Sequence, residues 1–319
     1  MSLSRSPKPE PRSSTVAALQ LTPRQEMMWL EDALHPGVPA NHVLTLLTIS
    51  GALDVERFRR AWSTVIEQAD ALRMRMRRTG ARIQLIAEPQ ADEAIWETRD
   101  VRLEPEPQGA ARRAVLSMCQ PSFEEEAPLY RAMLVQVAEE QFTFALDQHH
   151  SITDSQSCLL LHAALERAYS SGVGSPPPSF VDGMADRIHY SQSPVASEAR
   201  QFWAEHLEDA SEPGSFYGRP SSGKRARTIR RTRDLSAATA VAIRERRLDA
   251  SPSLVFSAAL AAWLSRVADG MDADGMDIVF GVPLLSRPDA FRESLGLFME
   301  ICPNRIKVDA RDTFADTLA

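Results

Sequence analysis

The feature that most constrains the fold is a series of three patterns that follow one another without a break. Phe142–Leu146 is apolar and has the length of a buried strand, and the polar stretch Asp147–Ser155 follows it directly. A helical pattern, capped by Asp154 or Ser155, then continues to about Tyr169. A strand, a polar loop and a helix in this order can hold a base at the floor of a cleft.

Two adjacent histidines, His149 and His150, lie in this polar loop, and Asp154 follows four residues after the second. An imidazole has an unperturbed pKa of about 6.5, so it can accept and return a proton near neutral pH. We therefore interpret His150 as a candidate base. The residues alone leave two alternatives open: a loop histidine whose hydrogen bonds are satisfied within the fold, and an Asp154 that serves only as a helix N-cap.

The segment His149–Asp154 resembles the HHxxxDG signature of nonribosomal peptide synthetase condensation domains and related acyltransferases, with Ser155 in the place of the glycine. Other segments are similar to motifs of the same family and occur in the family's order. They are Leu21–Leu30 with His35–Gly37 (the opening motif), Ala69–Arg75 (HExLRTxF, with Ala69 in the place of His), Phe202–Trp203, Gly281–Pro283 with Ser286–Pro288 (G-x-P…GRP), and Leu295–Arg305 (IGxFVNTxxxR, with Glu300 in the place of Asn). By these ordered matches the chain is identified as a divergent member of the HHxxxDG superfamily, which has the chloramphenicol-acetyltransferase-like fold.

This resemblance implies an α/β fold with mixed sheets, in which two lobes form a V and the histidine motif lies at their joint. The implied partners are acyl or peptidyl carrier proteins, which present substrates on phosphopantetheine; the chain itself is expected to bind no cofactor directly. The implied reaction is condensation-type acyl transfer: a carrier-bound thioester and an amine or alcohol acceptor form an amide or ester in natural-product (antibiotic) biosynthesis. Two alternatives stay open, an epimerisation-type domain and a catalytically silent module that docks carrier proteins or tailoring enzymes.

The resemblance also implies roles within the site. The catalytic motif comprises His150, His149 and Asp154; His150 meets the acceptor amine and donor thioester, and the ring of His149 is turned into the fold. Asp154 could orient the imidazole as in a triad, but the resemblance favours a structural salt bridge. Its expected partner is Arg73, which matches the arginine of HExLRTxF. The expected substrate contacts are Ser155, Glu300 and Arg287.

Composition argues against several other functions. The net charge of −7 and a pI near 5.6 argue against nucleic acid as a partner. Adjacent histidines usually point apart, and no HExxH or similar ligand spacing is present, so we expect no metal site. Cysteines are sparse and scattered, which is typical of a cytoplasmic protein; they are Cys119, Cys158 and Cys302. We expect neither a membrane span nor a signal peptide, because no sufficiently long apolar stretch is visible.

Helical and strand patterns occur on both sides of a stretch rich in proline and glycine, Ser170–Ser179, which indicates two mixed α/β lobes. The expected divisions are a disordered tail at 1–18, an N-terminal lobe at 19–170, a linker at 171–195 and a C-terminal lobe at 196–319. Family members continue past the segment that matches Leu295–Arg305, so the second lobe is expected to be partial. The chain would then be a fragment, a truncated product or one half completed by another polypeptide.

The same periodicities predict individual elements. Helices are expected at 21–32, 55–69, 108–118, 155–169, 197–207, 236–248 and 252–268. Strands are expected at 43–50, 72–77, 82–87, 129–137, 141–146, 228–235 and 277–281, with a hairpin-like segment at 296–308.

Overall fold

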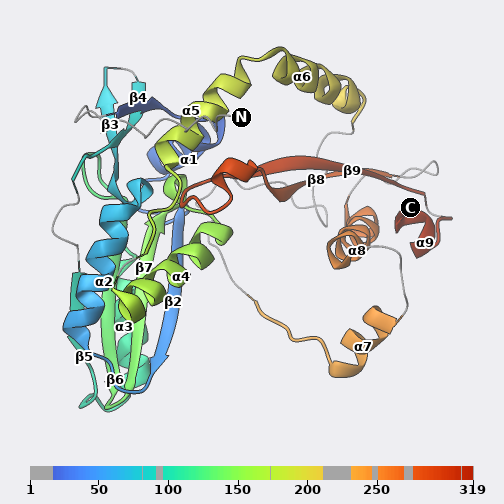
Figure 1. Ribbon diagram of the computed structural model, residues 1–319. Coiled ribbons are helices and arrows are strands. Elements are labelled where there is room, and N and C mark those ends of the chain that lie inside the picture. Colours follow the sequence, from blue (N-terminus) through green and yellow to red (C-terminus); the bar gives the residue numbers. More distant parts are fainter. Residues whose placement is uncertain are drawn as a thin grey trace, which may run out of the picture. The chain divides into compact units, whose positions relative to one another are not determined.

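The computed structural model describes residues 17–80, 82–90, 96–172, 174–210, 231–245, 251–268, 276–309 and 311–318. The chain divides into two compact units (Figure 1). The first unit comprises Met1–Ser193 and Leu285–Met299, and the second comprises Pro194–Leu284 and Glu300–Ala319. Leu285–Met299, named the return segment below, therefore belongs to the first unit although it lies within the range expected for the C-terminal lobe.

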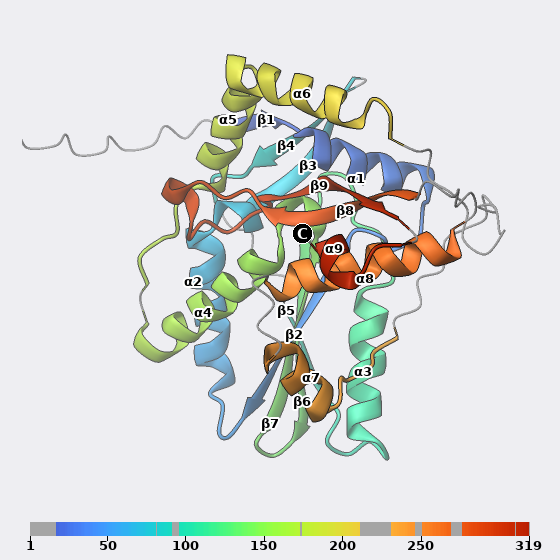
Figure 2. The same ribbon diagram turned by 90° about the vertical axis from the view of Figure 1, so that its right-hand side faces the viewer.

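A four-stranded sheet forms the centre of the first unit, in the order β2-β7-β6-β5. Neighbours among β2, β7 and β6 are antiparallel, and β5 pairs in parallel with β6. The strands are β2 (His42–Ser50), β5 (Trp96–Asp100), β6 (Tyr130–Ala138) and β7 (Gln141–His149). In Figure 2 the sheet lies between the helix pair α2 (Val55–Gln68) and α4 (Ser155–Ser171) on one side and α3 (Pro107–Met118) on the other. The central strands are therefore covered on both faces.

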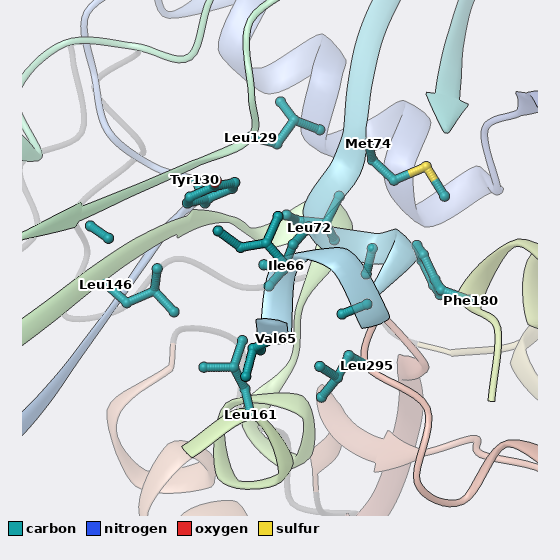
Figure 3. Close-up of a cluster of buried hydrophobic side chains, with 14 of the residues drawn as sticks. Val65, Ile66, Leu72, Met74, Leu129, Tyr130, Leu146, Leu161, Phe180 and Leu295 are labelled. Atoms are coloured by element: carbon teal, nitrogen blue, oxygen red, sulfur yellow. The ribbon is translucent and has the colours of Figure 1, made fainter. Parts of the chain in front are cut away.

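Helix α2 illustrates how the sequence builds the core of this unit. Asp54 caps its first turn through the side-chain carboxylate. Apolar residues recur at helical spacing and are buried on one face: Phe58, Ala61, Trp62, Val65 and Ile66. Figure 3 shows Val65 together with Leu161 of α4 and Leu295 of the return segment. Because burial of one large apolar side chain contributes about 1.5–3 kcal/mol, this cluster fixes α2, α4 and the return segment as one body.

A second sheet in the same unit has the order β1-β4-β3. It consists of β1 (Ala17–Gln20), β3 (Met74–Thr79) and β4 (Arg82–Ala87). Helix α1 (Pro23–Leu34) and the short 3-10 helix η1 (Asp70–Arg73) belong to the same unit. Residues 17 and 18, expected in a disordered tail, instead pair with β4. Residues 1–16 of that tail lie outside the described residues. Strands β1 and β5 were not expected, because each has only four or five residues and so shows little alternation.

The expected linker contains a helix, α5 (Phe180–Ser191), so the expectation of a linker is wrong for these residues. Ser179 caps α5, and Phe180 and Met184 are buried at helical spacing. The carboxylate of Asp70 accepts a hydrogen bond from the backbone nitrogen of Phe180 at 2.9 Å. This contact supplies a partner for one of the free N–H groups that begin a helix, and it ties α5 to η1.

The second unit contains a two-stranded sheet and a small core. Its elements are α6 (Pro194–Leu207), α7 (Ala237–Glu245), α8 (Pro252–Val267), β8 (Met276–Leu285) without its last residue, β9 (Met299–Val308) without its first residue, and α9 (Phe314–Leu318). Ala261, Ile278 and Val308 are buried together. Residues 231–235 of the expected strand at 228–235 are not a strand, and residues 228–230 lie outside the described part of the chain. The expected hairpin-like segment at 296–308 contributes one strand, β9, which pairs with β8.

The described helices do not combine the length and the apolar character that crossing a bilayer requires.

Candidate active site

The histidine motif occupies the turn between the end of β7 and the start of α4. Strand β7 ends at His149, a 3-10 turn named η2 (His150–Ile152) follows, and Asp154 caps α4. The backbone N–H of His150 donates to the carbonyl oxygen of Asn41 at 2.8 Å, and that of His149 donates to the carbonyl oxygen of Leu129 at 2.9 Å. The residues that directly precede β2 and β6 thus hold the backbone of the motif before any side chain contributes.

The imidazole of His150 is half-buried and has one fixed hydrogen bond. Its Nδ1 lies 2.8 Å from the carbonyl oxygen of Thr153. A carbonyl oxygen can only accept, so Nδ1 carries the proton and Nε2 keeps its lone pair in the neutral ring. Nε2 makes no hydrogen bond to any residue that the structure describes. A neutral imidazole in this tautomer can accept a proton at Nε2.

The ring of His149 is turned into the fold and is buried. Its Nε2 lies 2.8 Å from Oδ2 of Asp32, and its Nδ1 accepts a hydrogen bond from the backbone nitrogen of Ser151 at 3.0 Å. An Nδ1 that accepts leaves the proton on Nε2, which donates to the Asp32 carboxylate. Because both ring nitrogens are used inside the fold, His149 stabilises the turn.

Asp154 is fully buried and accepts hydrogen bonds from two chain segments. The backbone nitrogen of Ser157 donates to Oδ1 at 2.7 Å, and the backbone nitrogen of Phe298 in the return segment donates to Oδ2 at 2.9 Å. Nη2 of Arg287 donates to both oxygens, at 3.1 and 3.2 Å. The side chain of Arg287 is only 6% exposed. This set of contacts, named the Asp154 lock below, joins the N-terminus of α4 to the return segment.

The prediction of a salt bridge between Arg73 and Asp154 is therefore wrong, because the arginine that pairs with Asp154 is Arg287. Arg73 donates to the carbonyl oxygens of Ile66 at 2.8 Å and Glu67 at 2.6 Å. These carbonyls belong to the last turn of α2, where helix carbonyls lack intrahelical partners and attract cations. Arg287, expected to contact substrate, is the true partner of Asp154 and is not available to substrate.

Burial shifts the pKa of two arginines at or beside the Asp154 lock. Burial lowers the pKa of Arg287, and the carboxylate of Asp154 opposes that shift. Burial also lowers the pKa of Arg187, a residue of α5 whose Nη1 donates to the carbonyl oxygen of Phe298 at 3.1 Å. The return segment is thus fixed from α4 and from α5.

A second buried histidine–carboxylate pair lies next to the motif, and sequence reasoning missed it. Nδ1 of His42 lies 2.9 Å from Oδ2 of Asp147, and Arg131 approaches the same oxygen at 3.5 Å. Burial and the nearby Asp147 carboxylate raise the pKa of the Cys119 thiol to about 12. The strand alternation of β7 places Asp147 on the same face as His149, which is the signal that could have found this pair.

The remaining predicted residues lie in different units. Ser155 is the first residue of α4 and its side chain is exposed. Glu300 is a half-buried residue of β9 and belongs to the second unit. Among the described residues, no group of three or more histidine, cysteine, aspartate or glutamate side chains is arranged to hold a metal ion.

Known proteins resemble this chain in both sequence and structure. The family model of the condensation domain matches residues 17–319. One of the linear gramicidin synthase proteins of Brevibacillus parabrevis is 26% identical, over 94% of this chain and 4% of its own length. One of the surfactin synthase proteins of Bacillus subtilis (strain 168) is 24% identical, over 92% of this chain and 8% of its own length.

Two solved structures extend the likeness to the fold. A mutant of the starter condensation domain of rhizomide synthetase, in complex with C8-CoA and Leu-SNAC, has a TM-score of 0.82 at 22% identity, covering 94% of this chain and 69% of that chain. The first condensation domain of the calcium-dependent antibiotic synthetase, in complex with a substrate analogue, has a TM-score of 0.77 at 22% identity, covering 95% of this chain and 72% of that chain.

The chain belongs to the condensation-domain family of nonribosomal peptide synthetases, because the family model matches nearly all of it. It has the mixed α/β, chloramphenicol-acetyltransferase-like fold of the solved condensation domains. It spans 4% and 8% of the length of the two synthetases named above.

Proposed function

We propose that this domain transfers an acyl group from a carrier-bound thioester to an amine or alcohol, and that His150 is the base. The proposed donor is held on the phosphopantetheine arm of an acyl or peptidyl carrier protein. The observation that carries the proposal is the hydrogen bond from Nδ1 of His150 to the Thr153 carbonyl. Because this bond uses Nδ1, the basic nitrogen Nε2 of the half-buried His150 ring keeps its lone pair, just after the end of β7.

The proposed reaction needs one proton to move twice. A neutral amine attacks the thioester carbon, the C–N bond forms, and the carbonyl π electrons move to oxygen. The resulting ammonium gives its proton to Nε2 of His150. The electron pair on oxygen then re-forms the C=O bond as the C–S bond breaks, the C–S electron pair leaves with sulfur, and the imidazolium returns the proton to the thiolate. General acid–base help of this kind contributes roughly 10²–10⁴-fold, and positioning of an already activated thioester contributes the rest.

Two further side chains are proposed to contact substrate. The hydroxyl of Ser155 is exposed in the first turn of α4, where backbone N–H groups favour partial negative charge on a ligand. The carboxylate of Glu300 suits an ammonium group of an acceptor. Arg287 is not included, because its guanidinium is committed to the Asp154 lock.

Amide formation followed by mass spectrometry tests the proposal. The chain is mixed with an acyl carrier protein loaded with an acyl group and with a panel of amines and alcohols. We expect product with the wild type and a loss of roughly 10²–10⁴-fold with His150→Ala. His162→Ala is the matched control, because His162 is also a half-buried histidine and lies within α4; it should keep the wild-type rate.

The alternatives predict other outcomes. Equal rates for the wild type and His150→Ala would contradict the assignment of the base. Tight binding of carrier proteins without turnover would favour a silent docking module. Inversion of a carrier-bound aminoacyl group without condensation would favour an epimerisation-type domain.

A further inference from the structure

One face of helix α1 supports the histidine turn. Gln25, Met28 and Asp32 are spaced three and four residues apart, so they share a face of this helix. Asp32 accepts the hydrogen bond from Nε2 of His149 described above. The carbonyl oxygen of Met28 accepts from the side chain of Asn41 at 3.0 Å. The backbone carbonyl of that same asparagine receives the N–H of His150, so α1 supports the turn through an intermediate residue as well.

Gln25 uses both ends of its side-chain amide and is only 1% exposed. Its Oε1 accepts from the backbone nitrogen of Thr22 at 2.9 Å and from the Thr22 hydroxyl at 3.1 Å, which completes the capping box at the start of α1. Its Nε2 donates to the carbonyl oxygen of Ser151 at 2.8 Å. Ser151 directly follows His150, so this bond fixes the peptide backbone beside the proposed base.

The turn η2 needs such outside support, because it has little of its own. It is a three-residue 3-10 helix, a geometry with poor internal hydrogen bonds. Its backbone bond from Thr153 to His150 is long, at 3.5 Å. Ser151 is fully buried, and a buried carbonyl that loses its donor must find another partner or move. The Gln25 amide is therefore well placed to decide where the turn, and with it the His150 ring, lies.

We propose that Gln25 is a positioning residue for His150: it holds η2 through the Ser151 carbonyl and so sets the direction of Nε2. This inference rests on the proposed function of His150 as the base. Gln25 acts through the backbone and does not contact substrate. A shift of about 1 Å in a catalytic group can lower a rate by roughly 10²-fold, so a loosened turn should lower kcat and leave KM nearly unchanged.

Gln25→Glu is the most informative variant, because it keeps the acceptor for Thr22 and replaces the donor to Ser151 with a carboxylate. We expect kcat per folded molecule to fall roughly 10–10²-fold at about pH 7.5. Protonation of the new carboxyl restores a donor, and burial raises the pKa of a carboxyl. The ratio of the variant's kcat to that of the wild type should therefore rise as the pH falls towards about 5. Gln25→Met, which has similar volume and no donor, should show the same fall without recovery, and it serves if the buried carboxylate prevents folding.

Thr22→Ala is the matched control. It removes the cap hydroxyl but leaves the bond between Gln25 and Ser151, so stability should fall while kcat per folded molecule stays at the wild-type value. A second readout does not depend on turnover. The ¹⁵N NMR signals of His150 in the labelled chain should show protonated Nδ1 in the wild type and in Thr22→Ala, and a changed environment in Gln25→Glu.

Two results would overturn the inference. One is an unchanged kcat together with unchanged His150 ¹⁵N signals in the folded Gln25 variants. The other is an equal fall of kcat in Thr22→Ala and the Gln25 variants at every pH, since that would reduce the effect to helix stability. If the wild type gives no turnover, the proposed function fails, and the NMR comparison alone then decides whether Gln25 positions the ring.

Discussion

The two ends of the histidine motif differ in what their side chains contact. Asp154 is fully buried, and its carboxylate receives hydrogen bonds from Ser157, Phe298 and Arg287. His150, four residues earlier, is half-buried and keeps Nε2 without a partner among the described residues. One end of the motif therefore stabilises the fold, and the other carries the nitrogen that we propose to act as the base. Closeness in sequence does not make the two residues a catalytic pair.

The cause of this difference lies in where each side chain is placed. Asp154 lies at the N-terminus of α4, where free N–H groups and the helix dipole favour a carboxylate. The return segment adds a cation and a further N–H at the same point. His150 lies one turn earlier, and its ring is oriented by the backbone carbonyl of Thr153. In the proposed mechanism, this carbonyl takes the orienting role that a carboxylate plays in a triad.

The largest effect is expected from breaking the Asp154 lock. Arg287→Met should lower the free energy of unfolding by about 3–5 kcal/mol, because it leaves a buried carboxylate without its cation. Arg73→Met is the matched control and should cost less, because it removes hydrogen bonds to carbonyls near the end of α2 and keeps the cation of the Asp154 lock in place. Chemical denaturation measures both. A larger loss for Arg73→Met would contradict the assignment of Arg287 as the partner.

A smaller effect is expected at Gly296, where the return segment meets α5. This glycine has φ of 151°, and a Cβ there would lie 2.1 Å from Cδ2 of Phe180. Gly172 also has positive φ, at 78°, but a Cβ there would meet open space. Gly296→Ala should therefore destabilise the protein by roughly 1–3 kcal/mol more than Gly172→Ala, which is the cost of overpacking. Equal losses in thermal or chemical unfolding would show that the return segment does not pack on α5.

The smallest effect concerns the thiols that flank the motif. Burial raises the pKa of Cys158 and, with the nearby Asp147, raises the pKa of Cys119 to about 12. Both thiols stay protonated at pH 8, so iodoacetamide should label half-buried Cys302 before either of them.

The unfolded chain releases these protons from about pH 8.5, so the unfolding free energy should fall as the pH rises from there towards 12. Rapid labelling of Cys119 in the folded chain would contradict its burial.

Local patterns in the sequence predicted most of the first unit. Helix α2 and strand β7 were predicted because their apolar spacing is regular over many residues, whereas β1 and β5 are too short to show one. Helix α5 was expected as linker because the prolines before it end regular structure, and its anchor, Asp70, lies 110 residues away from Phe180. The histidines and Asp154 were found because they are neighbours in the chain.

The partners of the site residues could not be predicted in the same way. Two arginines, Arg73 and Arg287, match family motifs, and only the fold shows which one reaches Asp154. The contacts of Gln25 and Asp32 with the turn join residues 126 and 117 positions apart. Such contacts depend on how α1 packs against η2, which periodicity within either segment does not describe.

The central claim is that Asp154 stabilises the fold and that His150 is the base. Its most direct test is the single-turnover rate of amide formation per folded molecule in His150→Gln and Asp154→Asn. We predict a loss of roughly 10²–10⁴-fold for His150→Gln and a rate within about tenfold of the wild type for the folded fraction of Asp154→Asn. Equal losses in the two folded variants, or a wild-type rate in His150→Gln, would contradict this claim.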